Sequence, residues 1–109
     1  MARQSTSTGK IDKDKFNKVN RQLSALHQEV SILSKRKPDD AINKFKLKFI
    51  NQVLVEVNAV LNRKNKPFQD FATFQEDEMP TNSDVVMILA QYLECFDRQG
   101  RDRSSFINV

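Results

Sequence analysis

The stretch FNKVNRQLSALHQEVSIL, residues 16–33, decides the fold of this chain. Its apolar residues follow one another at alternating steps of three and four: Phe16, Val19, Leu23, Leu26, Val30 and Leu33. This heptad pattern predicts a helix over about 12–35 with a narrow apolar stripe that packs on another helix at a shallow angle. Because the stripe is short for an autonomous coiled coil, a partner helix in the same chain is favoured over a second copy.

Beyond this helix, a break is expected at residues 35–40, KRKPDD. Pro38 disfavours helix at the residue before it, and either Asp39 or Asp40 can cap the helix that follows. The second helix is predicted over about 40–63 and has two apolar stripes: Ile42, Phe45, Phe49, Val53 and Val60 in one, and Leu47, Ile50, Leu54, Val57 and Leu61 in the other. A helix this apolar is expected to be the central one. Its exposed strip is expected to hold Lys44, Lys48, Asn51, Asn58 and Asn62.

Residues 65–80 are the hardest to assign. Phe68, Phe71, Ala72 and Gln75 have the spacing of a short helix that begins at Pro67, and the acidic run at 76–78 indicates a turn. The third full helix is expected to start at 81–84, where Thr81 and Asp84 resemble a capping box and Ser83 is an alternative cap. Gly100 is predicted to end it in a left-handed conformation.

These patterns predict an all-α fold: a three-helix bundle (up-down-up) with an additional short helix and a disordered N-terminal arm. The arm covers residues 1–10, a single helical domain covers 11–100, and a C-terminal tail covers 101–109. A length of 109 residues suits one domain, and two glycines with 39% hydrophobic residues are typical of a helix-rich protein.

The residue types point away from catalysis. Gly9 and Gly100 are the only glycines, too few for a phosphate-binding or dinucleotide-binding loop. His27 is expected to be an exposed helical histidine, and Cys95 a small buried hydrophobe. The acidic residues 76–78 and Asp84 lack the ligand spacing and the glycine of an EF-hand loop. We therefore expect no enzyme, no cofactor, no metal site and no small-molecule substrate.

Charge is distributed unevenly along the chain. Residues 1–66 hold 15 Lys and Arg against 6 Asp and Glu, whereas residues 67–109 hold 3 against 8. Such a division suits a chain that attracts a polyanion with one part and another subunit with the other. The sequence has no apolar segment of bilayer length, so no membrane contact and a cytoplasmic location are expected.

The cations near the first hairpin form the candidate nucleic-acid site. In a helical hairpin the end of the first helix adjoins the start of the second, so two basic sets are expected to form one patch. With two cations from the start of the first helix, the predicted site is Lys35, Arg36, Lys37, Lys44, Lys46, Lys48, Lys18 and Arg21. Such residues contact phosphates without identifying bases. Ordinary solvation of Lys-rich helix faces is the alternative.

The acidic run Glu76, Asp77 and Glu78 is the candidate subunit contact. Three adjacent carboxylates before a helix form a compact negative surface that can dock on a basic face of another subunit. Contact of this kind between copies would be head-to-tail self-association, which propagates rather than closes.

In size, helicity and basic character, with the Lys and Arg sets at 35–37 and 44–48 as the nearest features, the chain resembles the small subunits of CRISPR RNA-guided effector complexes. That resemblance implies an antiviral defence complex in which helical bundles hold a guide–target duplex or a displaced single strand without cleaving it. The leading hypothesis is a non-catalytic subunit of a multi-subunit nucleoprotein complex that binds DNA or RNA backbone. The alternative is a protein–protein adaptor, most simply a homodimer through the seam from Phe16 to Leu33.

Overall fold

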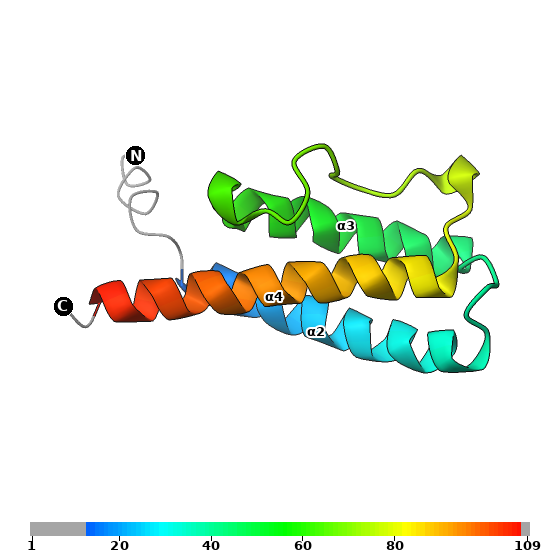
Figure 1. Cartoon of the computed structure of the whole chain (residues 1–109), viewed down its shortest axis with the longest axis horizontal. Helices are drawn as coiled ribbons and strands as arrows, with labels where there is room; N and C mark the ends of the chain where they lie inside the picture. Colours follow the sequence, from blue (N-terminus) through cyan, green and yellow to red (C-terminus); the bar gives the residue numbers. More distant parts are fainter. Residues whose placement is uncertain (1–12, 108–109) are drawn as a thin grey trace.

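The computed structural model describes the backbone of residues 13–107 and the side chains of residues 13–101. Within this part the chain has three α-helices, α2 (Lys13–Arg36), α3 (Lys44–Val60) and α4 (Asn82–Ile107), and two short 3-10 helices, η1 (Arg63–Asn65) and η2 (Glu76–Glu78). The three α-helices lie side by side along the long axis of the molecule (Figure 1). The prediction of an all-α three-helix bundle is confirmed, and the arm predicted over 1–10 lies outside the described residues.

The heptad seam of α2 packs inside the chain. Phe16, Val19, Leu23 and Val30 are buried in one core with residues of α3 and α4. The Phe16 ring lies against Phe96 of α4, with 4.9 Å between ring centroids. A second copy cannot use this seam without opening the core, so the structure does not support a homodimer through it.

Only one of the two apolar stripes of α3 is fully used by the core. Leu47, Ile50, Leu54, Val57 and Leu61 are buried. On the other stripe, the side chain of Phe45 is 68% exposed and that of Phe49 is 41% exposed. The expectation that this helix is central is therefore wrong, because one of its apolar faces lies at the surface.

The helix order is up-down-down, not up-down-up as predicted. Residues next to the starts of α3 and α4 form an antiparallel bridge, Ala41 with Thr81. Near the other ends of the same helices, Gln99 of α4 accepts a hydrogen bond from the backbone of Asn62 at 2.7 Å. The two helices are thus parallel to each other. The connection over 61–81 makes this possible, because an extended chain of this length can run back along all of α3, about 25 Å.

This connection runs alongside α3 (Figure 1). Asparagine side chains of α3 bind its backbone. The Asn51 amide donates to the Phe74 carbonyl at 3.0 Å and accepts from the Phe74 N–H at 2.9 Å. The Asn58 amide donates to the Ala72 carbonyl at 3.0 Å. The short helix predicted from Pro67 does not form, because these side chains bind backbone groups that a helix would use internally. Asn51 and Asn58 are therefore partly covered and do not form the exposed strip that we expected.

The start of α4 agrees with the sequence prediction, whereas the start of α3 and the end of α4 differ from it. The capping box at α4 is confirmed: the Thr81 N–H donates to the Asp84 carboxylate and the Asp84 N–H donates to the Thr81 hydroxyl, both at 3.1 Å. The cap of α3 is Asn43, whose side chain accepts from two backbone N–H groups. Asp39 and Asp40 do not cap α3; the Asp40 carbonyl instead accepts from the N–H of Asn82 at 2.9 Å, which satisfies the start of α4.

Gly100 does not end α4. The helix continues to Ile107, and among the described residues no glycine has a positive φ. The predicted tail over 101–109 is therefore helical as far as residue 107. A Cβ atom on Gly100 would lie 3.7 Å from the Phe16 ring. Gly100 is thus the residue at which α4 passes the start of α2.

Candidate nucleic-acid interface

The structure brings the hairpin cations to one end of the bundle but not to one face. Lys35, Arg36 and Lys37 end α2 and the corner after it, and Lys44 to Lys48 begin α3. Lys46 turns toward α2, with its Nζ 4.0 Å from a carboxylate oxygen of Glu29. Residues two apart on a helix point in nearly opposite directions, so Lys44 and Lys48 share a different face. The predicted continuous patch is divided by the groove between the helices.

Carboxylates share this hairpin end. The parallel arrangement of α3 and α4 places the η2 turn and the start of α4 beside the hairpin, joined by the hydrogen bond from the Ile42 N–H to the Pro80 carbonyl at 2.9 Å. The described anions of this end are Asp39, Asp40, Glu76, Asp77, Glu78 and Asp84, all exposed. Together with Glu29, which lies 4.0 Å from Lys46, they number seven against the six cations at 35–37, 44, 46 and 48. The hairpin end therefore has no excess of positive charge.

The remaining two predicted site residues lie far from this end. Lys18 and Arg21 are on the first half of α2, 17 and 14 residues before Lys35. At the rise of an α-helix these separations correspond to about 26 and 21 Å. The predicted site therefore does not form a single surface.

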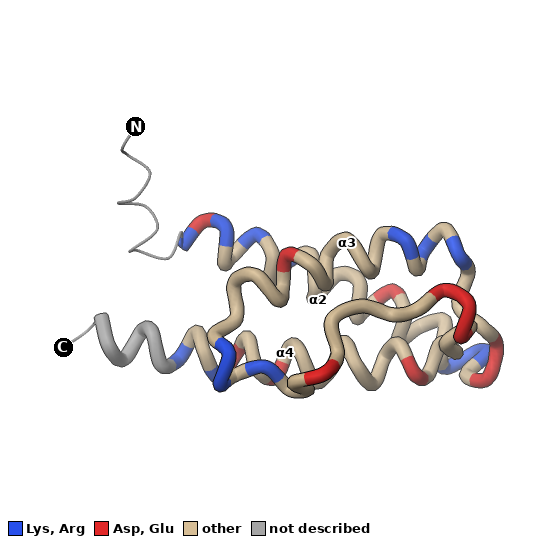
Figure 2. The backbone as a smooth tube through the Cα atoms, turned by 90° about the horizontal axis from the view of Figure 1, so that it is seen from above, with Lys and Arg blue, Asp and Glu red and all other residues tan. Residues whose placement is uncertain are grey.

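A second concentration of cations lies at the opposite end, which we call the basic end. Its described cations come from the start of α2, from η1 and the residue after it, and from α4: Lys13, Lys15, Lys18, Arg63, Lys64, Lys66, Arg98 and Arg101. They are eight against five nearby described anions, Asp14, Glu56, Asp70, Glu94 and Asp97. Figure 2 shows mainly blue segments at this end, and blue and red segments together at the hairpin end.

The backbone of the basic end is fixed by one buried side chain. Gln99 is 1% exposed; its Oε1 accepts from the Asn62 N–H at 2.7 Å and from the Asn65 side chain at 3.0 Å. Its Nε2 donates to the Val60 carbonyl at 3.0 Å. The turn that carries Arg63 and Lys64 is thereby attached to α4.

The sequence contained part of the signal for the basic end. Residues 63–66, RKNK, are visibly basic, but they follow the second predicted helix, where cations complement the negative pole of the helix dipole, so their charge alone does not indicate a binding surface. Their proximity to Arg98 depends on the parallel order of α3 and α4, which periodicity does not specify. An up-down-up bundle would have placed the end of α4 at the hairpin.

Two of these positive charges are already engaged. The Lys15 Nζ lies 3.0 Å from Glu56 of α3, and Arg101 pairs with Asp97 one turn before it. Both pairs are exposed at the surface, where such contacts contribute little to stability. The side chains of Lys13, Lys18, Lys64 and Lys66 take part in no ion pair within the described residues.

The reactive side chains of Cys95 and Tyr92 are part of the hydrophobic core. Cys95 is buried, as predicted, and burial raises the pKa of its thiol, with Arg98 opposing and Glu94 adding to the shift. Burial also raises the pKa of Tyr92, against the hydrogen bond that its hydroxyl donates to Asn58 at 3.0 Å. His27 is half-buried, not exposed as expected.

Among the described residues, His, Cys, Asp and Glu side chains form no group that could hold a metal ion. None of the helices described here has the length and apolarity needed to cross a bilayer. Comparison with protein-family models, with curated proteins and with solved structures found no match for this chain.

Proposed function

We propose that this chain is a non-catalytic helical subunit of a nucleoprotein complex that contacts nucleic-acid backbone through its basic end. The observation that carries the proposal is the convergence of eight described cations from three segments of the chain on one end of the bundle. Phosphate contacts require exposed Lys and Arg at intervals along a surface and no base-reading element. A rigid scaffold that presents such cations fits a backbone-directed, sequence-tolerant contact.

The predicted hairpin residues rank second as a nucleic-acid surface. Seven carboxylates share their end of the bundle, so an approaching polyanion would meet no excess of positive charge there. At the basic end the excess of three positive charges remains within the described residues. Long-range attraction of a polyanion depends on such an excess.

Head-to-tail self-association stays part of the proposal in a modified form. Glu76, Asp77 and Glu78 are exposed at the hairpin end, and the basic end lies at the other extreme of the long axis. Copies joined through these surfaces would use the same cations that contact nucleic acid. Self-association and nucleic-acid binding would then compete. CRISPR effector complexes are one kind of assembly in which this chain would act, as a small helical subunit.

Salt dependence and a matched pair of variants test this proposal. We expect the full chain to bind fluorescent mixed-sequence single- or double-stranded oligonucleotides. If about five phosphates are neutralised, the affinity should fall between about 50 and 200 mM salt by roughly 500-fold for a duplex and roughly 130-fold for a single strand. Lys64→Glu with Lys66→Glu should weaken binding strongly across all sequences. Lys44→Glu with Lys48→Glu makes the same change in charge at the hairpin end and should weaken it much less.

The control for folding is the circular dichroism spectrum, which should be the same for all variants because these side chains are exposed or half-buried. Binding that is insensitive to salt, or equal effects of the two double variants, would contradict the assignment of the basic end.

A further inference from the structure

Phe68 lies in the basic half of the connection after α3 and outside the hydrophobic core. Of the three phenylalanines in this connection, Phe71 and Phe74 pack on the core, whereas Phe68 is half-buried and does not belong to that packing within the described residues. Its ring contacts Phe71 edge to face, with 6.4 Å between centroids. In such a pair each ring keeps at least one face that its partner does not cover. The core therefore does not use the Phe68 ring, and Phe71 covers at most one of its faces.

The backbone keeps this ring next to η1. The Gln69 side chain donates to the Arg63 carbonyl at 3.4 Å, so the residue after Phe68 folds back on the first residue of η1. Lys66 is two residues before Phe68, which limits the distance between their Cα atoms to about 7 Å. The ring is thus held beside the segment that carries Arg63, Lys64 and Lys66.

The charges around Phe68 favour an anion. Residues 63–70 hold three cations, Arg63, Lys64 and Lys66, and one carboxylate, Asp70. None of these four side chains takes part in an ion pair within the described residues. The part of α4 at the same end adds two cations and two carboxylates, Arg98, Arg101, Glu94 and Asp97. A ligand at this ring therefore meets an aromatic surface with an excess of two positive charges around it.

We propose that the basic end binds single-stranded nucleic acid, with one base stacked on the Phe68 ring and the adjoining phosphates on Lys64 and Lys66. This inference rests on the proposed function and names its substrate class. Proteins that bind single strands combine cations along the nucleic-acid backbone with aromatic rings on which bases stack. In a duplex the bases are paired and stacked on one another, so a duplex can use the cations but not the ring. The ring therefore favours a single strand over a duplex.

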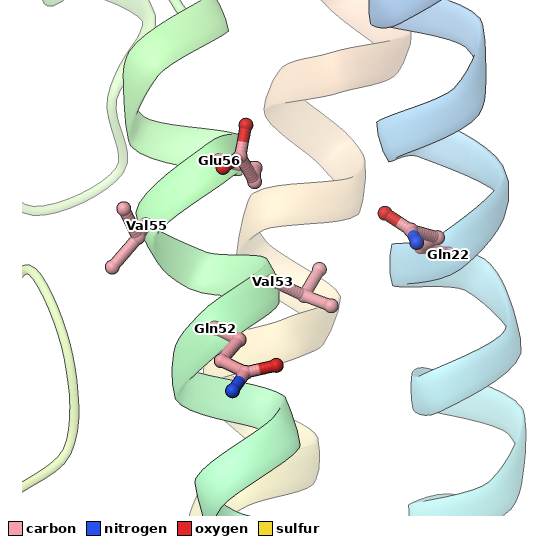
Figure 3. A pocket seen from close by; sticks show the side chains of 5 residues that line it. All are labelled: Gln22, Gln52, Val53, Val55 and Glu56. Atoms are coloured by element: carbon pink, nitrogen blue, oxygen red, sulfur yellow. The ribbon is translucent and has the colours of Figure 1, made fainter.

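The hollows between α2 and α3 do not offer this combination. The charged side chains that line them are three cations and three carboxylates: Lys15, Lys18, Lys46, Asp14, Glu29 and Glu56. The hollow drawn in Figure 3 is lined by glutamine, valine and glutamate side chains and by no aromatic ring. Phe45 and Phe49 are exposed rings, but they lie at the hairpin end, where positive charge is not in excess. A partly exposed ring and an excess of cations coincide at Phe68.

The test compares binding of the full chain to one fluorescent mixed-sequence oligonucleotide as a single strand and as a duplex. At about 200 mM salt, where phosphate contacts are weak, the single strand should bind more tightly. Phe68→Leu keeps an apolar side chain but removes the ring, and it should weaken single-strand binding roughly 5- to 150-fold, the effect of losing one stacked base. Duplex binding should stay unchanged. Phe45→Leu removes an exposed ring at the hairpin end and is the matched control, which should leave both affinities unchanged.

A second variant reports on the stacking itself. The chain has no tryptophan, so Phe68→Trp introduces a single indole ring. Its fluorescence should be quenched when a base stacks on it, and this variant should retain single-strand binding because it keeps an aromatic ring. Phe45→Trp should show no quenching. Circular dichroism spectra should be the same for all four variants.

Three results would overturn the proposal. Phe68→Leu binds the single strand as tightly as the unchanged chain, or it weakens duplex binding by the same factor, which would make the ring a structural element only. The third is that a saturating single strand leaves the fluorescence of Phe68→Trp unchanged. Weaker binding of both oligonucleotides by Lys64→Glu with Lys66→Glu would still support phosphate contact at the basic end. Failure of the stacking proposal is thereby distinguished from failure of the proposed function.

Discussion

Gln99 shows how much of the fold depends on one polar side chain. It is buried in α4, yet its three hydrogen bonds all go to the end of α3 and to the turn after it. Buried polar groups are stable only when they are paired, so the backbone of Asn62 and Val60 relies on this side chain. The parallel contact of α3 and α4 is therefore held at this end by the Gln99 amide. An apolar side chain could not donate a hydrogen bond to the Val60 carbonyl at the end of α3.

We predict that Gln99→Leu lowers the free energy of unfolding by about 2–4 kcal/mol. Leucine occupies a similar volume but leaves the Asn62 N–H, the Asn65 amide and the Val60 carbonyl without partners. Urea unfolding followed by circular dichroism measures the change. Gln91→Leu on the same helix is exposed and should change stability by less than about 0.5 kcal/mol. A loss of the same size in both variants would mean that the hydrogen bonds of Gln99 contribute nothing specific.

At the scale of the elements, the sequence predicted what depends on periodicity. The helix expected over 12–35 is Lys13–Arg36, because a heptad stripe specifies both that the segment is helical and which face of the helix is buried. The helix ends were less predictable. Asn43 and Asp40 are both good cap residues; α3 is capped by Asn43, while the backbone carbonyl of Asp40 accepts a hydrogen bond from Asn82 at the start of α4. Local signals cannot show that a distant helix will use a backbone group.

We predict that Gly100→Ala raises the free energy of unfolding by about 0.5–1 kcal/mol. Gly100 is inside α4, where alanine is the better helix former, and the added Cβ would lie at ordinary contact distance, 3.7 Å, from the Phe16 ring. The opposite exchange on the same helix, Ala90→Gly, should lower stability by about 1 kcal/mol. Thermal unfolding measures both. If Gly100 ended the helix in a left-handed conformation, alanine would destabilise the protein, so the sign of the change decides between the two structures.

At the scale of the whole molecule, the direction of α4 decides where the charges lie. The sequence predicted the helices and most of the core, but the direction depends on contacts between distant residues, such as Asn51 with Phe74 and Gln99 with Asn62. Compared with an up-down-up bundle, the observed direction of α4 places the acidic turn Glu76–Glu78 at the hairpin and Arg98 near the start of α2. The individual cations could be predicted from the sequence, whereas the surface that they form could not.

The direction of α4 can be tested with a new disulfide between Ala41 and Thr81. The hydrogen bonds from Ile42 to Pro80 and from Asn82 to Asp40 flank this pair, which makes it a close pair with Cα atoms about 4.5 Å apart. This separation suits a disulfide. In an up-down-up bundle the same residues would lie at opposite ends, about 25 Å apart, and no bond would form.

We expect Ala41→Cys with Thr81→Cys to form this bond under mild oxidation and to gain at most about 4 kcal/mol relative to the reduced protein, because the bond closes a loop of some 40 residues. The single variant Thr81→Cys is the reference, since this change also removes the hydroxyl that caps α4. Peptide mass mapping distinguishes the new bond from one involving Cys95, which is buried. If both new thiols stay free under oxidation, α4 does not begin beside the start of α3, and the charges assigned to the basic end would no longer share one surface.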